Sequence, residues 1–168
     1  MSEIVLQFCA FPSFWGRLID YGTEGEVGHV DALTPDRSQL FGAQHDAGLG
    51  GAPAGVQFRP TGYVREAGGY NLLRVHLACT PAQHDRFWRF MKAQEGKPYD
   101  VKGILGFLAG RYWHDRGHWW CSQLHTAGLE PKVAGVFPNR LWTRFNRLTP
   151  QELLLVTSAL GRVERVLT

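Results

Sequence analysis

Short apolar stretches separated by Gly, Pro and Asp dominate the first half of the chain, a pattern typical of β-strands joined by turns. The residues at positions 34–37, Thr-Pro-Asp-Arg, favour a tight turn that would join two strands into a hairpin. Positions 44–54 are rich in Gly and Ala, and we expect a loop there that borders a cleft. The predicted strands are Ile4–Phe8, His29–Leu33, Gln39–Ala43, Gly55–Arg59 and Leu72–Ala78.

The second half of the chain predicts helices. At Thr80 a capping residue is followed by Pro and then Gln, which is a strong helix start, and the helix should extend to about Glu95. The same start recurs at Thr149 and predicts a helix through about Leu160. A further helix is expected from Val101 to about Ala109, capped by Asp100. Strands followed by helices indicate an α+β fold.

Composition places this fold in one globular domain spanning residues 1–168, because 44% of the residues are hydrophobic. No apolar run approaches the roughly 18 to 20 residues that would span a bilayer, and the first residues lack a positively charged region before their apolar stretch. We therefore expect a soluble, cytoplasmic protein. The net charge of +3 is small, so the late arginines predict a solvated face rather than a nucleic-acid partner.

The cysteines are three and widely spaced, which argues against a disulfide framework and favours a reducing compartment. Cys9 and Cys79 follow apolar strands and have the setting of core residues. Cys121 instead falls in the first turn of a predicted short helix that Gly128 would end. A helix N-terminus and a nearby imidazolium lower the pKa of thiols, so this position suits a nucleophile. The alternative is a cysteine simply buried among aromatic residues.

A thiol nucleophile needs a base, and histidine is the usual one at neutral pH. Among seven histidines, His29 is the one that begins a strand, where Gly28 leaves space beside its ring. A third polar group should orient the imidazole, and the adjoining strand ends at Gln44 and His45. Gln44 is favoured because alternate strand residues share a face, but a slip of one residue would select His45.

Four segments in order carry a resemblance: positions 28–30 (Gly-His-Val), 41–44 (Phe-Gly-Ala-Gln), 96–100 (Gly-Lys-Pro-Tyr-Asp) and 120–124 (Trp-Cys-Ser-Gln-Leu). In this order the chain resembles the NlpC and lecithin–retinol acyltransferase group of papain-like cysteine enzymes. The resemblance implies a circularly permuted papain-like fold, in which an antiparallel sheet packs against helices and the histidine strand precedes the cysteine helix.

The resemblance also implies site residues and chemistry. It carries the nucleophile onto Cys121, the base onto His29 and the third polar residue onto Gln44, and it places Tyr99 near the developing oxyanion. Relatives often have His at the third position, so His45 stays an alternative to Gln44. The implied function is a cysteine peptidase or amidase that forms a thioester, without a cofactor, in a bacterium or a phage. Peptidoglycan peptides, other amides and lipid acyl esters are the implied substrates, and acyl transfer or thioester hydrolysis fits the same fold.

Two other classes of function compete with this hypothesis. His114, His118, Cys121 and His125 are spaced by four, three and four residues, which would align four zinc ligands on a continuous helix. Against this, the Asp-Arg-Gly sequence at positions 115–117 indicates a turn that would scatter these ligands. The other class is a catalytically inactive binding module that keeps the fold.

Overall fold

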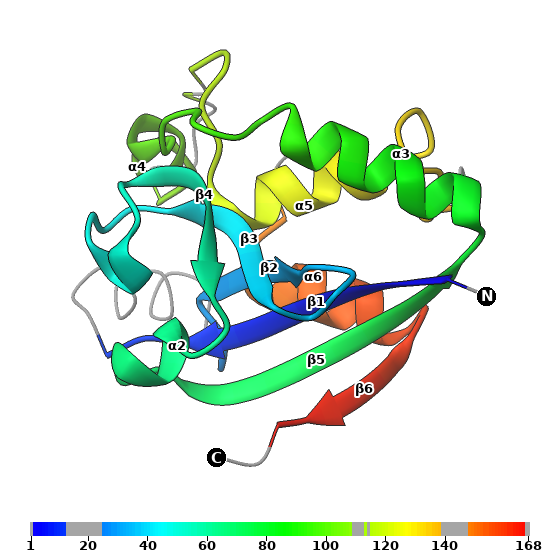
Figure 1. Ribbon diagram of the computed structural model, residues 1–168. Coiled ribbons are helices and arrows are strands. Elements are labelled where there is room, and N and C mark those ends of the chain that lie inside the picture. Colours follow the sequence, from blue (N-terminus) through cyan, green and yellow to red (C-terminus); the bar gives the residue numbers. More distant parts are fainter. Residues whose placement is uncertain (1, 13–24, 109–112, 114, 139–147, 167–168) are drawn as a thin grey trace.

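The computed structural model of the protein describes residues 2–12, 25–108, 113, 115–138 and 148–166. In this part of the chain six strands form one antiparallel sheet in the order β4-β3-β2-β1-β5-β6 (Figure 1). The strands are β1 (Ser2–Ala10), β2 (His29–Leu33), β3 (Gln39–Gln44), β4 (Gly55–Pro60), β5 (Tyr70–Cys79) and β6 (Arg162–Arg165).

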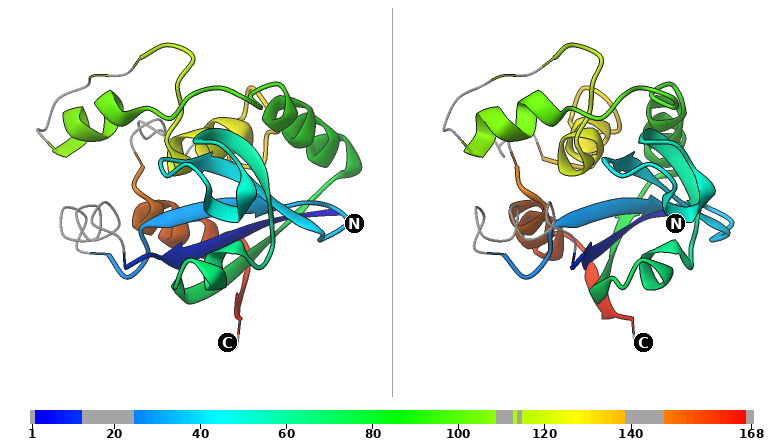
Figure 2. Two further views of the ribbon diagram at one scale, coloured as in Figure 1. Left: turned by 60° about the vertical axis from the view of Figure 1, so that its left-hand side comes forward. Right: turned by 90° about the vertical axis from the view of Figure 1, so that its left-hand side faces the viewer.

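Helices cover both faces of the sheet unequally. On one face lie α3 (Pro81–Lys92), α5 (Cys121–Leu129) and α6 (Pro150–Ser158), while α2 (Tyr63–Glu66) and the short 3₁₀ helix η1 (Leu49–Gly51) lie on the other (Figure 1). Figure 2 shows α4 (Val101–Leu108) standing away from the sheet. None of the helices in the described ranges is long and apolar enough to cross a membrane.

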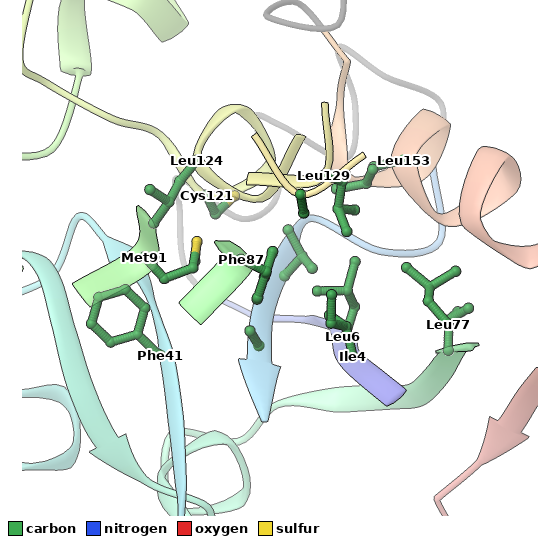
Figure 3. Packing of buried hydrophobic residues seen from close by; sticks show 14 of the residues in the cluster. Ile4, Leu6, Phe41, Leu77, Phe87, Met91, Cys121, Leu124, Leu129 and Leu153 are labelled. Atoms are coloured by element: carbon green, nitrogen blue, oxygen red, sulfur yellow. The ribbon is translucent and has the colours of Figure 1, made fainter. Parts of the chain in front are cut away.

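Alternation of side chains along the strands divides the core into two clusters. Leu6 and Phe8 of β1 point to the larger cluster, which is closed by Phe87 of α3 and Leu124 of α5 (Figure 3). Val5 of β1 points to the smaller cluster, which lies under α2 and η1. Each fully buried apolar side chain of this size stabilises the fold by about 1.5–3 kcal/mol. The larger cluster therefore holds α5 against the sheet.

The predicted α+β class and most predicted elements are confirmed. Each predicted strand is present, and the largest difference is at β1, which extends two residues beyond Ile4–Phe8 at each end. Both capping boxes form, at Thr80 and at Thr149. Asp100 accepts a hydrogen bond from Gly103 N at 2.8 Å, as a helix cap does. The elements that sequence patterns did not predict, α2, η1 and β6, have only three or four residues each.

The helix that carries Cys121 begins as predicted but ends differently. Trp120 is its N-cap residue and Cys121 its first residue. The helix does not end at Gly128, as predicted, but continues to Leu129. Gly128 lies inside the helix, where an added Cβ would be 2.9 Å from Phe87 Cε2. The glycine therefore permits close packing of α3 against α5 and does not terminate the helix.

Gly128→Ala tests this packing role. Inside an ordinary helix the change would stabilise the protein by about 1 kcal/mol, because Ala has the higher helix propensity. Here we expect it to lower the free energy of unfolding by about 1–3 kcal/mol, because the methyl group overpacks the contact with Phe87. Urea unfolding measures the change, and adding Phe87→Leu should recover part of the loss. An increase in stability for Gly128→Ala alone would contradict the packing role.

Candidate active site

The β2–β3 hairpin brings several polar side chains to one end of the sheet. The two strands pair at Leu33–Leu40 and Ala32–Phe41, and beyond these pairs Asp31 approaches Gly42. A Cβ added to Gly42 would be 2.0 Å from Asp31 Oδ1. The glycine therefore supplies the space that the Asp31 carboxylate occupies, and the carboxylate can lie across the neighbouring strand.

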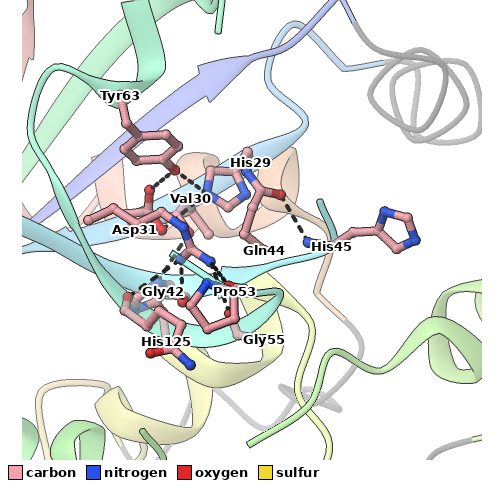
Figure 4. Close-up of polar contacts among 12 residues, drawn as sticks. His29, Val30, Asp31, Gly42, Gln44, His45, Pro53, Gly55, Tyr63 and His125 are labelled. Carbon is pink, nitrogen blue, oxygen red and sulfur yellow. Dashed lines mark hydrogen bonds and ion pairs between the residues drawn. The ribbon is translucent and has the colours of Figure 1, made fainter. Parts of the chain in front are cut away.

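His29 and Asp31 form a buried ion pair that Tyr63 of α2 completes (Figure 4). His29 Nε2 lies 3.0 Å from Asp31 Oδ1 and 3.1 Å from the Tyr63 hydroxyl oxygen. The Tyr63 hydroxyl donates to Asp31 Oδ2, so its oxygen can accept from His29. Because Nε2 is directed to this pair of oxygens, Nδ1 is the ring nitrogen left to face a reacting group.

The ion pair changes the pKa values of both partners. Burial disfavours the charged imidazolium, but the negative charge of Asp31 and the hydrogen bonds that the ring makes with Asp31 and Cys121 outweigh burial and raise the pKa of His29 to about 10. Burial likewise opposes ionisation of Asp31, yet His29, Tyr63 and Arg59 together lower its pKa to about 2. At neutral pH the pair is therefore an imidazolium and a carboxylate.

Arg59 of β4 is a second buried cation beside this pair. Its guanidinium donates to the carbonyl oxygens of Pro53 at 3.0 Å and of Gly42 and Gly55 at 3.3 Å. It also lies 5.9 Å from the centre of the Tyr63 ring. The hydrogen bonds of the two NH₂ groups and the ring contact offset part of the cost of burying this charge, and the charge in turn favours ionised Asp31.

Cys121 lies at the N-terminus of α5 and is 3% exposed. Hydrogen bonds link its side chain to His29 and to Tyr99. Trp120 provides no side-chain cap, so the first turn of α5 directs backbone N–H groups outward at the position of the sulfur. The structure thus brings together three of the predicted site residues, Cys121, His29 and Tyr99.

One turn further along α5, His125 links the helix to the strand that carries His29. Its Nε2 lies 3.2 Å from the Val30 carbonyl oxygen, and its side chain is fully buried. Burial lowers the pKa of His125 to about 4, so the ring is neutral and can donate from Nε2. This bond joins α5 to β2 between His29 and Asp31.

A short parallel bridge positions Tyr99. Trp119 N donates to Pro98 O and Asp100 N donates to Trp119 O, both at 3.1 Å, so the Tyr99 segment runs beside the residues that lead into Cys121. Burial and the negative charge of a thiolate at Cys121 raise the pKa of Tyr99 well above its usual value. Tyr99 therefore keeps its hydroxyl proton and remains a hydrogen-bond donor.

Gln44 and His45, the predicted orienting residues, both lie near the site but have other partners. Gln44 Oε1 accepts the His45 N–H at 3.1 Å, and its buried Nε2 has no hydrogen-bond partner among the described residues. The His45 ring lies 3.0 Å from Asp46 Oδ1 and packs edge-on against Tyr99. The groups against His29 Nε2 are Asp31 and Tyr63, which sequence reasoning did not select.

Asp31 could have been recognised from the sequence, because residues two apart on a strand share a face. Tyr63 and Arg59 carried no such signal. Tyr63 reaches the site from α2, which packs on one face of the sheet, and Arg59 reaches it from β4, which pairs with β3.

The zinc hypothesis finds no support in the described part of the chain. His114 lies outside it, and His118 precedes the helix that begins at Cys121. The Nε2 of His125 is directed to a backbone carbonyl. Within the described residues no group of three or more His, Cys, Asp or Glu side chains is arranged to hold a metal ion.

Comparison with known proteins does not assign a family: no family model matches the chain, and no curated protein matches its sequence. The fold and site by themselves define a mixed α+β protein in which a helix-terminal cysteine meets a histidine paired with a buried aspartate.

Asp31→Asn tests the buried ion pair through the pH dependence of stability. The pKa of His29 rises from 6.5 to about 10 on folding. Its contribution to the free energy of unfolding is therefore full below pH 6.5 and is lost as the pH rises toward 10. The pKa of Asp31 falls from 3.8 to about 2 on folding. Its contribution to the free energy of unfolding is therefore present above pH 3.8 and is lost as the pH falls toward 2. We expect the variant to lose about 3–5 kcal/mol of unfolding free energy between these limits.

Urea unfolding at about pH 5, 7 and 9 measures this loss, which should be largest at pH 5 and smallest at pH 9. Asp85→Asn, at an exposed carboxylate on α3, is the control and should change stability by less than about 0.5 kcal/mol. A loss that is independent of pH would contradict the ion pair.

Gly42→Ala tests the same pair without removing either charge. The new Cβ would occupy the place of Asp31 Oδ1, so the carboxylate must move away from His29. We expect the proton resonances of His29 to titrate at a lower pH in this variant than in the wild type, as followed by NMR. An unchanged His29 titration would show that Asp31 adapts without leaving the imidazole.

Proposed function

We propose that this protein is a cysteine-nucleophile hydrolase that cleaves an amide or acyl bond through a thioester at Cys121. The observation that carries the proposal is the hydrogen bond between Cys121 and His29, whose other ring nitrogen is held by buried Asp31. A cysteine at a helix N-terminus, a histidine and an orienting carboxylate are the parts that such an enzyme needs.

The proposed fold is a circularly permuted papain-like one. It is supported by the chain order, in which β2 with His29 precedes α5 with Cys121, and by the packing of α5 against an antiparallel sheet. Tyr99, which the resemblance placed near the developing oxyanion, hydrogen-bonds to Cys121 and so supports the same assignment.

In the proposed reaction the imidazolium of His29 stabilises negative charge on Cys121 Sγ, which attacks the substrate carbonyl carbon. The S–C bond forms and the carbonyl π electrons move to oxygen, giving a tetrahedral oxyanion. As the oxyanion collapses, His29 Nδ1 gives its proton to the leaving nitrogen or oxygen. Neutral His29 then takes a proton from water, which attacks the thioester, releases the acid and restores the thiolate–imidazolium pair.

Two donors are placed to stabilise the oxyanion in this proposal. The backbone N–H of Cys121 is at the first position of α5, and the Tyr99 hydroxyl lies against the thiol. Losing one such donor typically raises the barrier by about 2.7–4 kcal/mol. Amides, including peptidoglycan peptides, and acyl esters all react by this route, and an alcohol or amine in place of water would make the same protein an acyltransferase.

Alkylation by iodoacetamide tests the cysteine–histidine pair. The reagent reacts at its CH₂ group with loss of iodide, and peptide mass mapping reports Cys121, Cys9 and Cys79 separately. At about pH 6.5 we expect Cys121 to react at least about 10-fold faster in the wild type than in His29→Ala, because the imidazolium favours the thiolate. Cys9 and Cys79 serve as internal controls whose rates the variant should leave unchanged.

Equal Cys121 rates in the two proteins would overturn the proposed pair and favour a binding module. Cys121→Ser is the matched active-site control. It keeps a hydroxyl of similar size and should abolish turnover of any amide or ester that the wild type hydrolyses.

A further inference from the structure

The Gln44 amide is a buried donor without a partner at the end of β3. Its side chain belongs to a residue that is 6% exposed, and Nε2 has no hydrogen-bond partner among the described residues. The amide orientation is defined, because the His45 N–H is a donor and must meet Oε1. Leaving such a donor unpaired costs about 1–3 kcal/mol, so its presence needs an explanation, and a catalytic role is one.

The position of Gln44 places this donor beside the proposed reaction centre. Gln44 is the last residue of β3, and His29 is the first residue of the neighbouring strand β2. Figure 4 shows the Gln44 amide beside the His29 imidazole. His29 in turn hydrogen-bonds to Cys121, so a carbonyl attacked by the sulfur would lie within reach of this corner of the site.

The neighbouring residues hold the amide in place. His45 fixes Oε1 through its backbone and packs its ring against Tyr99 with 5.8 Å between the ring centres. Tyr99 hydrogen-bonds to Cys121. Gln44, His45 and Tyr99 therefore form a connected series that ends at the thiol. A movement of the Gln44 amide would disturb this series, which is the condition for a preorganised donor.

We infer that Gln44 is a catalytic residue whose Nε2 donates a hydrogen bond to the substrate carbonyl oxygen as it becomes an oxyanion. This inference rests on the proposed function and gives Gln44 a role different from orienting His29, which Asp31 and Tyr63 hold at Nε2. The ligand it implies is an acyl group with a carbonyl oxygen, and the bond would satisfy the amide only when substrate is bound.

Two reagents separate oxyanion stabilisation from imidazole orientation. p-Nitrophenyl acetate acylates a thiolate through a tetrahedral oxyanion, and its leaving group departs as p-nitrophenolate without needing a proton. Iodoacetamide alkylates the same sulfur without forming an oxyanion. A group that stabilises the oxyanion affects only the first reaction, whereas a group that orients His29 affects both.

We expect Gln44→Met to slow acylation of Cys121 by p-nitrophenyl acetate by about 10²- to 10³-fold, as loss of one oxyanion donor does. Alkylation by iodoacetamide should stay within about 3-fold of the wild type. Gln44→Glu keeps the acceptor for the His45 N–H and removes the donor, so it should slow acylation as well. Urea unfolding identifies a variant that has lost its fold, in which case the other variant decides.

A Gln44→Met variant that slows both reactions equally would overturn the inference and assign Gln44 to orienting His29. Unchanged acylation would also overturn it, because the amide would then play no part in the reaction. The proposed function fails in a different way: the wild type would not be acylated, and His29→Ala would leave alkylation of Cys121 unchanged.

Discussion

The buried ion pair between His29 and Asp31 is the interaction on which the arrangement of the site depends. Two charges taken out of water are stabilising only when their geometry is good and their remaining hydrogen-bonding capacity is satisfied. Tyr63 donates a hydrogen bond to Asp31 Oδ2, and Arg59 contributes a compensating charge while its two terminal NH₂ groups donate to backbone carbonyls. A cluster of this kind requires α2 to pack on one face of the hairpin and β4 to pair with β3, so the smaller hydrophobic cluster helps to hold the site in place.

On the other face of the sheet, packing determines where the thiol lies. Apolar side chains of α3, α5 and the strands fill the larger cluster, and Gly128 lets α3 approach α5 closely. The bond from His125 to the Val30 carbonyl then links α5 to β2 next to His29. The sulfur and the imidazole consequently belong to two elements that are each held by many contacts, and rigid elements of this kind hold reacting groups more reliably than loops do.

Prediction from the sequence succeeded where the physical signal was local. Strand alternation, the two capping boxes and the start of α5 at Cys121 depend on residues within one turn or strand, and these elements are confirmed. The end of α5 was predicted wrongly, because glycine at a helix end and glycine at a close helix contact have the same sequence signature. The distinction depends on Phe87, which lies on another helix.

For the site, the sequence by itself determined the candidate nucleophile and its histidine, since a helix start and a strand start are readable from nearby residues. It also contained Asp31, two positions from His29 and on the same strand face. Only the tertiary structure decided that Asp31, from the same strand, and Tyr63, from a distant short helix, lie against His29 Nε2. It also decided that the Gln44 amide nitrogen has no partner among the described residues. The reason is that hydrogen-bond partners of buried groups are selected by the packing of separate elements, and no local pattern records how those elements meet.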